Sequence, residues 1–466
     1  MNLPKYTPEE PISSIATALS PAALGIVRVS GKNSIDLISK VFSRPKALVQ
    51  ALGNTLVYGW IIDAENNNQK IDEVMLGVYK APKSFTGEDM VEIYCHGGLS
   101  VVTKIQGLLL QNGFRQALRG EYTFRSYING KTDLTKAEAV QEIIESHTDA
   151  SRGRAAGRLS GSLYNEIESI KQLIIDTLAS IEVEIEYPED EETISDTFDR
   201  KDIEIAVSRL QSLVDSWKSE KLYQDGARVV LCGRTNAGKS SLFNSLLKEE
   251  RAIVSDIEGT TRDWLESWAS FDGIPVRLFD TAGLRKTEDV IEAQGVELSV
   301  SLSKDSDLVL YLIDSENGIT DYDRDFLFKS NEKVIVVWNK IDKTQNKNKL
   351  CKEDFSKIKY YCGEVFLSAK KGTGISDIVQ LAKKVLTEGL NTDREQAGLG
   401  SARQKQSVEE ALESVKHSLI SADNNYSLDA VVQDLEDSLE SLGEVTGDVT
   451  PDDVLGNIFS RFCVGK

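Results

Sequence analysis

The residues whose types and spacing most clearly suggest a chemical role form a glycine-rich stretch, Gly233–Ser240. This stretch fits the phosphate-binding pattern GxxxxGK[ST]. Glycines let the backbone fold around phosphates so that successive N–H groups point inward, and a following helix N-terminus adds a potential that favours anions. Lys239 is expected to reach the β- and γ-phosphates, and the Ser240 hydroxyl to bind Mg²⁺. The pattern therefore predicts a nucleoside triphosphate site.

Three further motifs follow in the order that a guanine nucleotide site needs. In Asp280–Gly283 (DTAG), the carboxylate can hold Mg²⁺ through water and the glycine amide can contact the γ-phosphate. In Asn339–Asp342 (NKID), the last carboxylate can accept hydrogen bonds from guanine N1–H and N2–H, a donor pair that adenine lacks. Ser368–Lys370 would complete the base pocket. Each motif is expected at the carboxyl end of a strand, and together they predict GTP rather than ATP.

The switch and catalytic groups are less regular. In Gly259–Asp263 (GTTRD) one threonine, for which we favour Thr261, is expected to bind Mg²⁺ only when the γ-phosphate is present. Ras-type GTPases place a water-orienting glutamine directly after DTAG, whereas this chain has Leu284, which cannot hydrogen-bond. Another group must position the water, and the nearest carboxylates are Glu288, Asp289 and Glu292.

The elements that would position these residues follow from hydrophobic periodicity. Residues 223–384 alternate strands and helices, with near-continuous apolar runs that suit parallel strands buried on both faces. Trp264–Asp272 is a further strand, and the Asp272-Gly273 pair predicts an antiparallel hairpin to the next one. The runs that we expect to form the parallel strands are Val229–Cys232, Val276–Phe279, Leu308–Ile313 and Val334–Trp338, and Ser241–Leu247 is expected to be the helix after the phosphate loop.

The chain before residue 132 predicts an α+β module. Leu99–Gln111 has helical periodicity, and the expected strands are Gly25–Val29, Thr55–Ile62, Glu73–Tyr79 and Met90–Tyr94. Long amphipathic helices are expected in two other regions, at Ala137–Ile144, Gly157–Leu178, Ile203–Lys218, Val408–Leu419 and Leu428–Leu442.

Two details of the first helical region concern its glycines, for which two interpretations stay open, and an acidic run. Gly153, Gly157 and Gly161 would line one face of a helix and allow a close backbone crossing, or they would mark a frayed, polar helix start. The acidic run Tyr187–Glu192 is expected to be a solvated helix break.

An α/β domain inserted between two halves of a helical domain accounts for this order, because a compact domain with neighbouring ends is easily inserted. The predicted divisions are 1–131 (α+β), 132–222 (helical, first half), 223–384 (nucleotide-binding α/β) and 385–466 (helical, second half).

Composition narrows the class of protein. A chain of 466 residues is too long for one hydrophobic core, and about three domains are expected. The 74 acidic and 54 basic residues give a net charge of −20, which argues against a broadly basic coat for nucleic acid. The five cysteines include no CxxC pair, so neither a disulfide framework nor a zinc knuckle is expected. No signal peptide and no membrane span is predicted, which favours the cytoplasm.

Several blocks outside the nucleotide motifs resemble one family. They are GIVRVSG (Gly25–Gly31), SFTGEDMVEIYCHGG (Ser84–Gly98), GEYTFRSYINGKTDLTKAEAV (Gly120–Val140) and the final FCVGK (Phe462–Lys466). With GTTRD and DTAGLR, these blocks make the chain similar over essentially its whole length to the MnmE (TrmE) family of tRNA-modification GTPases. The resemblance implies an N-terminal folate-binding domain, a discontinuous helical domain and an inserted Ras-like P-loop GTPase domain.

The resemblance also implies a reaction. Members of this family work as homodimers with a flavin-dependent, FAD-containing partner of the MnmG type, in a heterotetramer. Together they add a (carboxymethyl)aminomethyl-type group to C5 of the wobble uridine (position 34) of certain tRNAs. The one-carbon unit comes from 5,10-methylene- or 5-formyl-tetrahydrofolate, whose contacts match Arg28, Glu92, Lys131 and Lys466. Cys463 matches a terminal cysteine with a proposed part in that chemistry.

For the GTPase domain, the resemblance implies dimerisation across the nucleotide, with K⁺ in the place of an arginine finger. The matching K⁺ ligands are Asn236, Ser255, Ile257 and Thr260, the Mg²⁺ ligands are Ser240 and Thr261, and Glu292 falls on the catalytic acid. The expected GTP contacts are Asn236, Ala237, Gly238, Lys239, Ser240, Ser241, Ser255, Asp256, Ile257, Glu258, Gly259, Thr260, Thr261, Asp280, Thr281, Ala282, Gly283, Asn339, Lys340, Asp342, Ser368 and Ala369.

The chain departs from the family pattern at three positions, and two other functions remain open. Arg119 stands where proline is usual, Glu258 where a small residue or proline is usual, and Trp338 is an unusual residue before NKID. The nucleotide motifs alone would also suit a ribosome-assembly switch without modification chemistry, for which folate binding has no place. Alternatively, the protein would be a folate-dependent one-carbon enzyme in which GTP only regulates.

Overall fold

The computed structural model describes residues 10–186, 200–249, 265–280, 304–343, 354–391, 397–424 and 428–465. By their internal contacts the residues form two compact units, each made of separate chain segments. The first unit is Met1–Gln141, Tyr164–Ala206 and Gln406–Lys466, and the second is Glu142–Leu163 and Val207–Lys405. The finer domain boundaries expected near residues 131, 222 and 384 stay predictions.

The first unit contains a six-stranded sheet in the order β3-β4-β5-β2-β1-β6. Alternation of side chains along these strands puts Val27 and Val29 in the core while Arg28 lies on the opposite face. Helices α1 (Ser34–Ser39), α2 (Pro45–Val49) and α3 (Leu99–Gln111) pack on the core face. The strands are β1 (Ile12–Ile15), β2 (Ala22–Ser30), β3 (Thr55–Asp63), β4 (Gln69–Tyr79), β5 (Met90–Gly97) and β6 (Arg115–Gln116). The four predicted strands and the predicted helix are confirmed.

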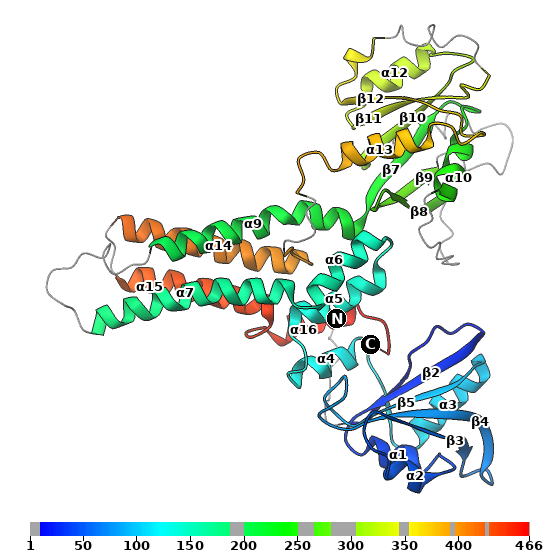
Figure 1. The fold of residues 1–466 in the computed structure, drawn as a ribbon, viewed down its shortest axis with the longest axis vertical. Coiled ribbons are helices and arrows are strands. Elements are labelled where there is room, and N and C mark those ends of the chain that lie inside the picture. The colour runs from blue at the N-terminus through cyan, green and yellow to red at the C-terminus, as the bar shows by residue number, and fades with distance from the viewer. Residues whose placement is uncertain are drawn as a thin grey trace. The chain divides into compact units, whose positions relative to one another are not determined.

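Long helices make up the rest of the first unit. In Figure 1, helices α7, α14 and α15 run side by side, and Lys171 of α7 pairs with Asp448 just after α15 at 2.7 Å. The predicted helices at residues 137–144, 203–218, 408–419 and 428–442 are all confirmed, each within a longer helix. The helices that contribute to this unit are α4 (Glu121–Ile128), α5 (Leu134–Glu145), α7 (Ser162–Glu186), α9 (Arg200–Asp225), α14 (Ala402–Asp423), α15 (Leu428–Thr446) and α16 (Asp452–Ser460).

The helix expected over Gly157–Leu178 is instead two helices. Helix α6 (Asp149–Leu159) ends before Gly161, whose φ of 101° belongs to the left-handed region, and α7 then begins at residue 162. The close backbone crossing is also wrong, because a Cβ on Gly153 would meet nothing within 4 Å. A capping box from Thr148 starts α6, so the alternative of a frayed start is wrong as well. The acidic run Tyr187–Glu192 lies outside the described residues.

The second unit is built on a sheet in the order β12-β11-β10-β7-β9-β8, parallel except for the edge strand β8. The left-handed pair Asp272 (φ 48°) and Gly273 (φ 94°) turns β8 into β9, which confirms the predicted hairpin, although Trp264 lies outside the described residues. The strands are β7 (Ala227–Gly233), β8 (Leu265–Phe271), β9 (Ile274–Asp280), β10 (Leu308–Asp314), β11 (Val334–Asn339) and β12 (Tyr361–Phe366).

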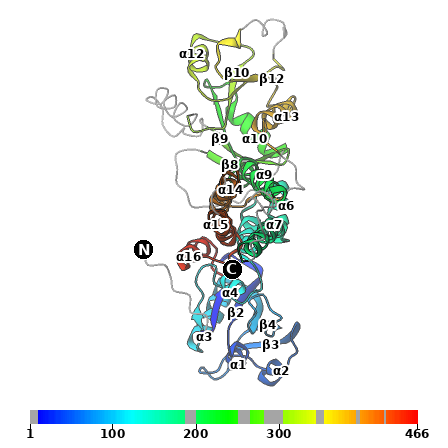
Figure 2. The same ribbon diagram turned by 90° about the vertical axis from the view of Figure 1, so that its left-hand side faces the viewer.

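Helices cover both faces of this sheet. Helices α10 (Lys239–Glu249) and α13 (Ile375–Leu386) pack on one face, while α12 (Asp321–Lys329) packs on the other (Figure 2). The helix expected after the phosphate loop is thereby confirmed as α10. Trp338 fills a buried position in β11, 1% exposed, and stacks on Phe366 of β12, as expected for a bulky residue there. In the described part of the chain, none of the helices has the length and apolarity that crossing a membrane requires.

Candidate functional site

The phosphate loop connects β7 to α10 in the second unit, and its glycines are required by its shape. Gly238 has a φ of 100°, and a Cβ there would collide with the side-chain amide of Asn339. Lys239 lies across the loop and donates from Nζ to the carbonyls of Gly233 (2.7 Å) and Arg234 (3.0 Å). The strand–loop–helix context that the motif needs is therefore confirmed.

Asn339 joins three of the predicted motifs. Its Nδ2 donates to the Ala237 carbonyl at 2.8 Å, so the end of β11 is tied to the phosphate loop. Its Oδ1 accepts from the backbone N–H groups of Lys340 (2.8 Å) and Ala369 (3.0 Å). Since this side chain is only 2% exposed, the three bonds form in a low dielectric, where they hold the motifs in one fixed arrangement.

Lys340 extends the same network toward β10. Its φ of 64° is left-handed, and its Nζ donates to the Asn236 carbonyl at 2.7 Å and to Asp314 Oδ2 at 2.8 Å. Burial alone would raise the pKa of Asp314, but the hydrogen bonds from Lys340 and the Glu316 backbone, together with the charges of Lys340 and Lys343, outweigh it and the pKa lies below its usual value. Asp314 was missed from the sequence, although its place directly after a buried apolar run was a usable signal.

Asp342 is the carboxylate expected to read the base. Ser368 Oγ donates to Asp342 Oδ1 at 2.7 Å, and this hydrogen bond lowers the pKa of Asp342, which favours its ionised form. Ser245 of α10 in turn donates to the Ala369 carbonyl at 2.8 Å and holds that loop. An ionised carboxylate beside a fixed loop can accept the two N–H groups of a guanine edge.

Oxygen atoms that could bind a divalent cation lie on two neighbouring elements. Asp280, the last residue of β9, is fully buried and stands in register with Leu231 of β7. Ser240 is exposed in the first turn of α10, at the helix N-terminus. Carboxylate and hydroxyl oxygens suit Mg²⁺, so the residues present fit that ion. No group of three or more His, Cys, Asp or Glu side chains that could hold a metal ion occurs among the described residues.

Part of the predicted site lies outside the described residues. It comprises Ser255, Asp256, Ile257, Glu258, Gly259, Thr260, Thr261, Thr281, Ala282, Gly283, Leu284, Glu288, Asp289, Glu292 and Lys466.

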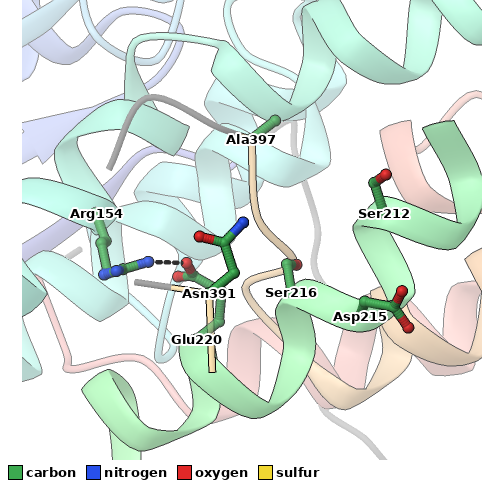
Figure 3. A pocket seen from close by; sticks show the side chains of 7 residues that line it. All are labelled: Arg154, Ser212, Asp215, Ser216, Glu220, Asn391 and Ala397. Carbon is green, nitrogen blue, oxygen red and sulfur yellow. Dashed lines mark hydrogen bonds and ion pairs between the residues drawn. The ribbon is translucent and has the colours of Figure 1, made fainter. Parts of the chain in front are cut away.

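A buried ionic cluster lies in the second unit where α6 meets α9. Arg158 donates to Glu142 and, at 2.7 Å, to Glu220, and Arg154 pairs with the other oxygen of Glu220. Beside it, side chains of α6 and α9 line a pocket together with Asn391 and Ala397 (Figure 3). The pocket residues are Arg154, Ser212, Asp215, Ser216, Glu220, Asn391 and Ala397.

The α5–α6 corner of the second unit also contacts the β8–β9 hairpin. The His147 ring stacks on Trp268 of β8 with 3.7 Å between ring centroids, and Ala150 joins the core beneath the sheet. Burial lowers the pKa of His147, and the nearby Arg277 lowers it further. In the chain, this hairpin lies between the GTTRD and DTAG motifs, so it connects both expected switch regions to the corner.

The predicted folate contacts lie in the first unit, and two of them are direct neighbours. Arg28 of β2 stands in register with Glu92 of β5, and Glu92 Oε1 accepts from Arg28 Nε at 2.9 Å and Nη2 at 2.7 Å. Tyr94 donates to Glu92 Oε2 at 2.6 Å, and burial together with this carboxylate raises the pKa of Tyr94. Arg28 also donates from Nη1 to the Gly465 carbonyl at 2.9 Å.

Lys131, a predicted folate contact, and Cys463, which the resemblance assigns to the modification chemistry, have different surroundings. Lys131 donates from Nζ to the Pro82 carbonyl at 3.0 Å. Cys463 is exposed, and its carbonyl accepts from the Gly120 N–H at 3.4 Å. Arg119, which departs from the family pattern, forms a backbone bridge with Val464. The sheet thus brings Arg28 and Glu92 together with the Cys463–Gly465 stretch.

Comparison with known proteins covers nearly the whole chain. Residues 11–131 match the model "GTP-binding protein TrmE N-terminus", and residues 134–463 match "MnmE helical domain". A Treponema denticola protein, "tRNA modification GTPase MnmE", is 49% identical over 100% of both chains. A Treponema pallidum (strain Nichols) protein of the same name is 41% identical over 100% of both. Among solved structures, Aquifex aeolicus Era bound to GDP·AlF4⁻ is 27% identical, covering 40% of this chain and 66% of that one, with a TM-score of 0.29. This chain therefore belongs to the MnmE family.

Proposed function

We propose that this chain is a GTPase that acts in the modification of tRNA. The observation that supports the proposal is the Asn339 network, which ties the phosphate loop, the NKID motif and the Ser368–Ala369 loop together, with Ser368 bonded to the Asp342 carboxylate that would read guanine. Membership of the MnmE family, whose curated relatives are named tRNA modification GTPases, supports the second half of the proposal.

Hydrolysis in this proposal uses two cations and one acid. Ser240 and Thr261 would hold Mg²⁺, and Asn236, Ser255, Ile257 and Thr260 would hold K⁺. Both ions would stabilise the negative charge that develops on the phosphates, a part that an arginine finger plays elsewhere. Glu292 would position the attacking water, because Leu284 has no hydrogen-bonding group.

The first unit would bind a reduced folate, 5,10-methylene- or 5-formyl-tetrahydrofolate, as the source of the one-carbon unit. The residues fit such a ligand, since Glu92 Oε2 accepts one bond from Tyr94 and has a second lone pair for a pterin N–H, and Lys131 offers a cation for carboxylates. Lys466 and Cys463 would complete this site. With an FAD-dependent MnmG-type partner, a homodimer would add a (carboxymethyl)aminomethyl-type group to C5 of uridine 34 in the cytoplasm.

The decisive experiment is nucleoside mass spectrometry of tRNA from cells that lack the protein. The wobble modification should disappear, return with the wild-type chain, and stay absent with Glu292→Ala, which should also abolish GTP hydrolysis. Unchanged wobble uridines in the deletion strain would refute the modification function. Full modification with a hydrolysis-dead Glu292→Ala protein would separate the two activities and refute their coupling.

Folate titration separates this proposal from a ribosome-assembly switch. Calorimetry with 5-formyl-tetrahydrofolate should detect binding to the wild type and weaker binding to Arg28→Ala. Absence of binding by the wild type would favour an assembly switch. The match of residues 11–131 to the TrmE N-terminus is the observation against that alternative.

A further inference from the structure

The last described residues of the chain are fixed on the N-terminal sheet of the first unit. The segment Phe462–Gly465, here called the docked segment, follows α16. Phe462 is 2% exposed and packs with Phe459, and Val464 forms an antiparallel bridge with Arg119. The segment therefore combines an apolar anchor at one end with backbone pairing in the middle.

Gly465 is required where it lies. Its φ of 97° is left-handed, and a Cβ there would come within 2.9 Å of the Ile15 carbonyl and 3.2 Å of Ala16 Cα. Both contacts are to backbone of the sheet region, which cannot turn aside as a flexible side chain would. Any side chain at this position would therefore lift the docked segment from the sheet.

Arg28 completes the docking with a charged hydrogen bond. Its Nη1 donates to the Gly465 carbonyl at 2.9 Å, while Nε and Nη2 donate to Glu92. Tyr122 donates to the Arg28 carbonyl at 2.7 Å, and its ring lies under the guanidinium at 5.6 Å. The planar fork of arginine makes these bonds in fixed directions, which lysine cannot do.

We propose that Arg28 is a positioning residue that holds the docked segment, so that the segment forms one wall of the folate site beside Glu92. Three donors of the guanidinium face protein acceptors, so its main contribution is to the shape of the site. The ligand part of this inference rests on the proposed folate function. If folate binds more tightly when the segment is docked, bound folate shifts the segment toward its docked form. By linkage, docking of the segment raises the affinity for folate by the same factor.

The docking itself is tested without any ligand. Hydrogen exchange of residues 462–465, followed by mass spectrometry, compares the wild type with Arg28→Gln and Gly465→Ala. Arg28→Gln should exchange about tenfold faster, the loss expected for one hydrogen bond to a charged group. Gly465→Ala should also exchange faster, because its Cβ would clash with the Ile15 carbonyl. Arg44→Gln is the matched control, since Arg44 also donates from Nη1 to a backbone carbonyl, that of Tyr58, at 3.1 Å. It should leave exchange at 462–465 unchanged.

Equal exchange rates in the wild type and both variants would overturn the positioning role. Gly465→Ala keeps the test valid if Arg28→Gln fails to fold. It changes a residue outside the hydrophobic core and leaves the Arg28–Glu92 pair in place.

The coupling is tested by adding 5-formyl-tetrahydrofolate. The ligand should slow exchange of the docked segment in the wild type, and Gly465→Ala should weaken ligand binding about tenfold, by the reciprocity of linkage. Ligand binding that is equally strong in Gly465→Ala would overturn the coupling. No binding by the wild type would overturn the folate assignment instead, while the ligand-free exchange result would still decide the role of Arg28.

Discussion

Substitution of Glu220 tests whether burial makes the ion pairs between α6 and α9 costly to break. The Glu220 carboxylate accepts from Arg158 at 2.7 Å and also pairs with Arg154, and Arg158 pairs in turn with Glu142. The side chains of Glu220 and Arg158 are 4% and 3% exposed. Gly398 packs closely on this side chain, since a Cβ there would lie 2.7 Å from Glu220 Oε1.

Glu220→Gln keeps the shape of the side chain and removes its charge. The cluster then changes from two cations and two anions to two cations and one anion. Breaking a buried ion pair by removing one of its charges costs about 3–5 kcal/mol. Coulomb's law gives a similar figure, about 4 kcal/mol for one pair at 4 Å in an effective dielectric of 20. This is a large share of a typical unfolding free energy of roughly 5–15 kcal/mol.

The assay must resolve the two units, because a single unfolding free energy is not defined for a chain that unfolds in parts. Native-state hydrogen exchange in a urea series gives an opening free energy for each peptide. Peptides from residues 142–163 and 207–225 should lose about 3–5 kcal/mol in Glu220→Gln. Peptides from the β2–β5 region of the first unit serve as an internal reference and should not change.

Asp423→Asn is the matched control. It removes the carboxylate of another interhelical arginine pair, Arg200–Asp423, whose side chains are 51% and 56% exposed. Solvent and salt screen such a pair, so no measurable change is expected. If Glu220→Gln lowered the opening free energy by less than about 1 kcal/mol, the buried cluster would behave like a surface pair and the desolvation argument would be refuted.

Three further changes test the nucleotide-binding unit. Gly238→Ala should abolish GTP binding, because its Cβ collides with Asn339. Gly318→Ala is the control: Gly318 has a φ of 70° but nothing within 4 Å of its Cβ position, so the substitution should strain the backbone and leave the GTP affinity, measured by titration, near that of the wild type. Asp342→Asn should weaken GTP by at least about a hundredfold and improve xanthosine triphosphate, because an amide donor suits the xanthine 2-carbonyl; unchanged nucleotide preference in competition assays would contradict the base-reading role. Burial lowers the pKa of His147 in the folded chain. The contribution of His147 to stability is therefore complete above the ordinary pKa of 6.5 and is lost as the pH falls through the lowered pKa. Carbon-13 spectra of the chain's 3 histidines would measure the titration midpoint of His147, and a midpoint at or above 6.5 would contradict this expectation.

Contiguous patterns in the sequence were sufficient to place three of the nucleotide motifs at the ends of strands. The P-loop, NKID and Ser368–Ala369 motifs each occupy a few adjacent residues at the end of a strand, so backbone geometry alone determines where their groups point. The Asp272-Gly273 hairpin was predictable for the same reason, since two residues with positive φ set the turn. A strand was expected before Ser368–Lys370, but the bounds of β12 were not predicted, because Gly363 interrupts its short run.

Contacts between distant residues were decided only by the tertiary structure. The sequence shows Arg28, Glu92 and Gly465 as separate charges and a glycine, and only the β2–β5 register and the docked segment bring them together. Pairing of Lys340 with Asp314 likewise depends on β10 and β11 being neighbours in the sheet. An ion pair of this kind leaves no periodic trace in the chain, because its energy depends on burial and distance, which exist only once the strands and helices have packed.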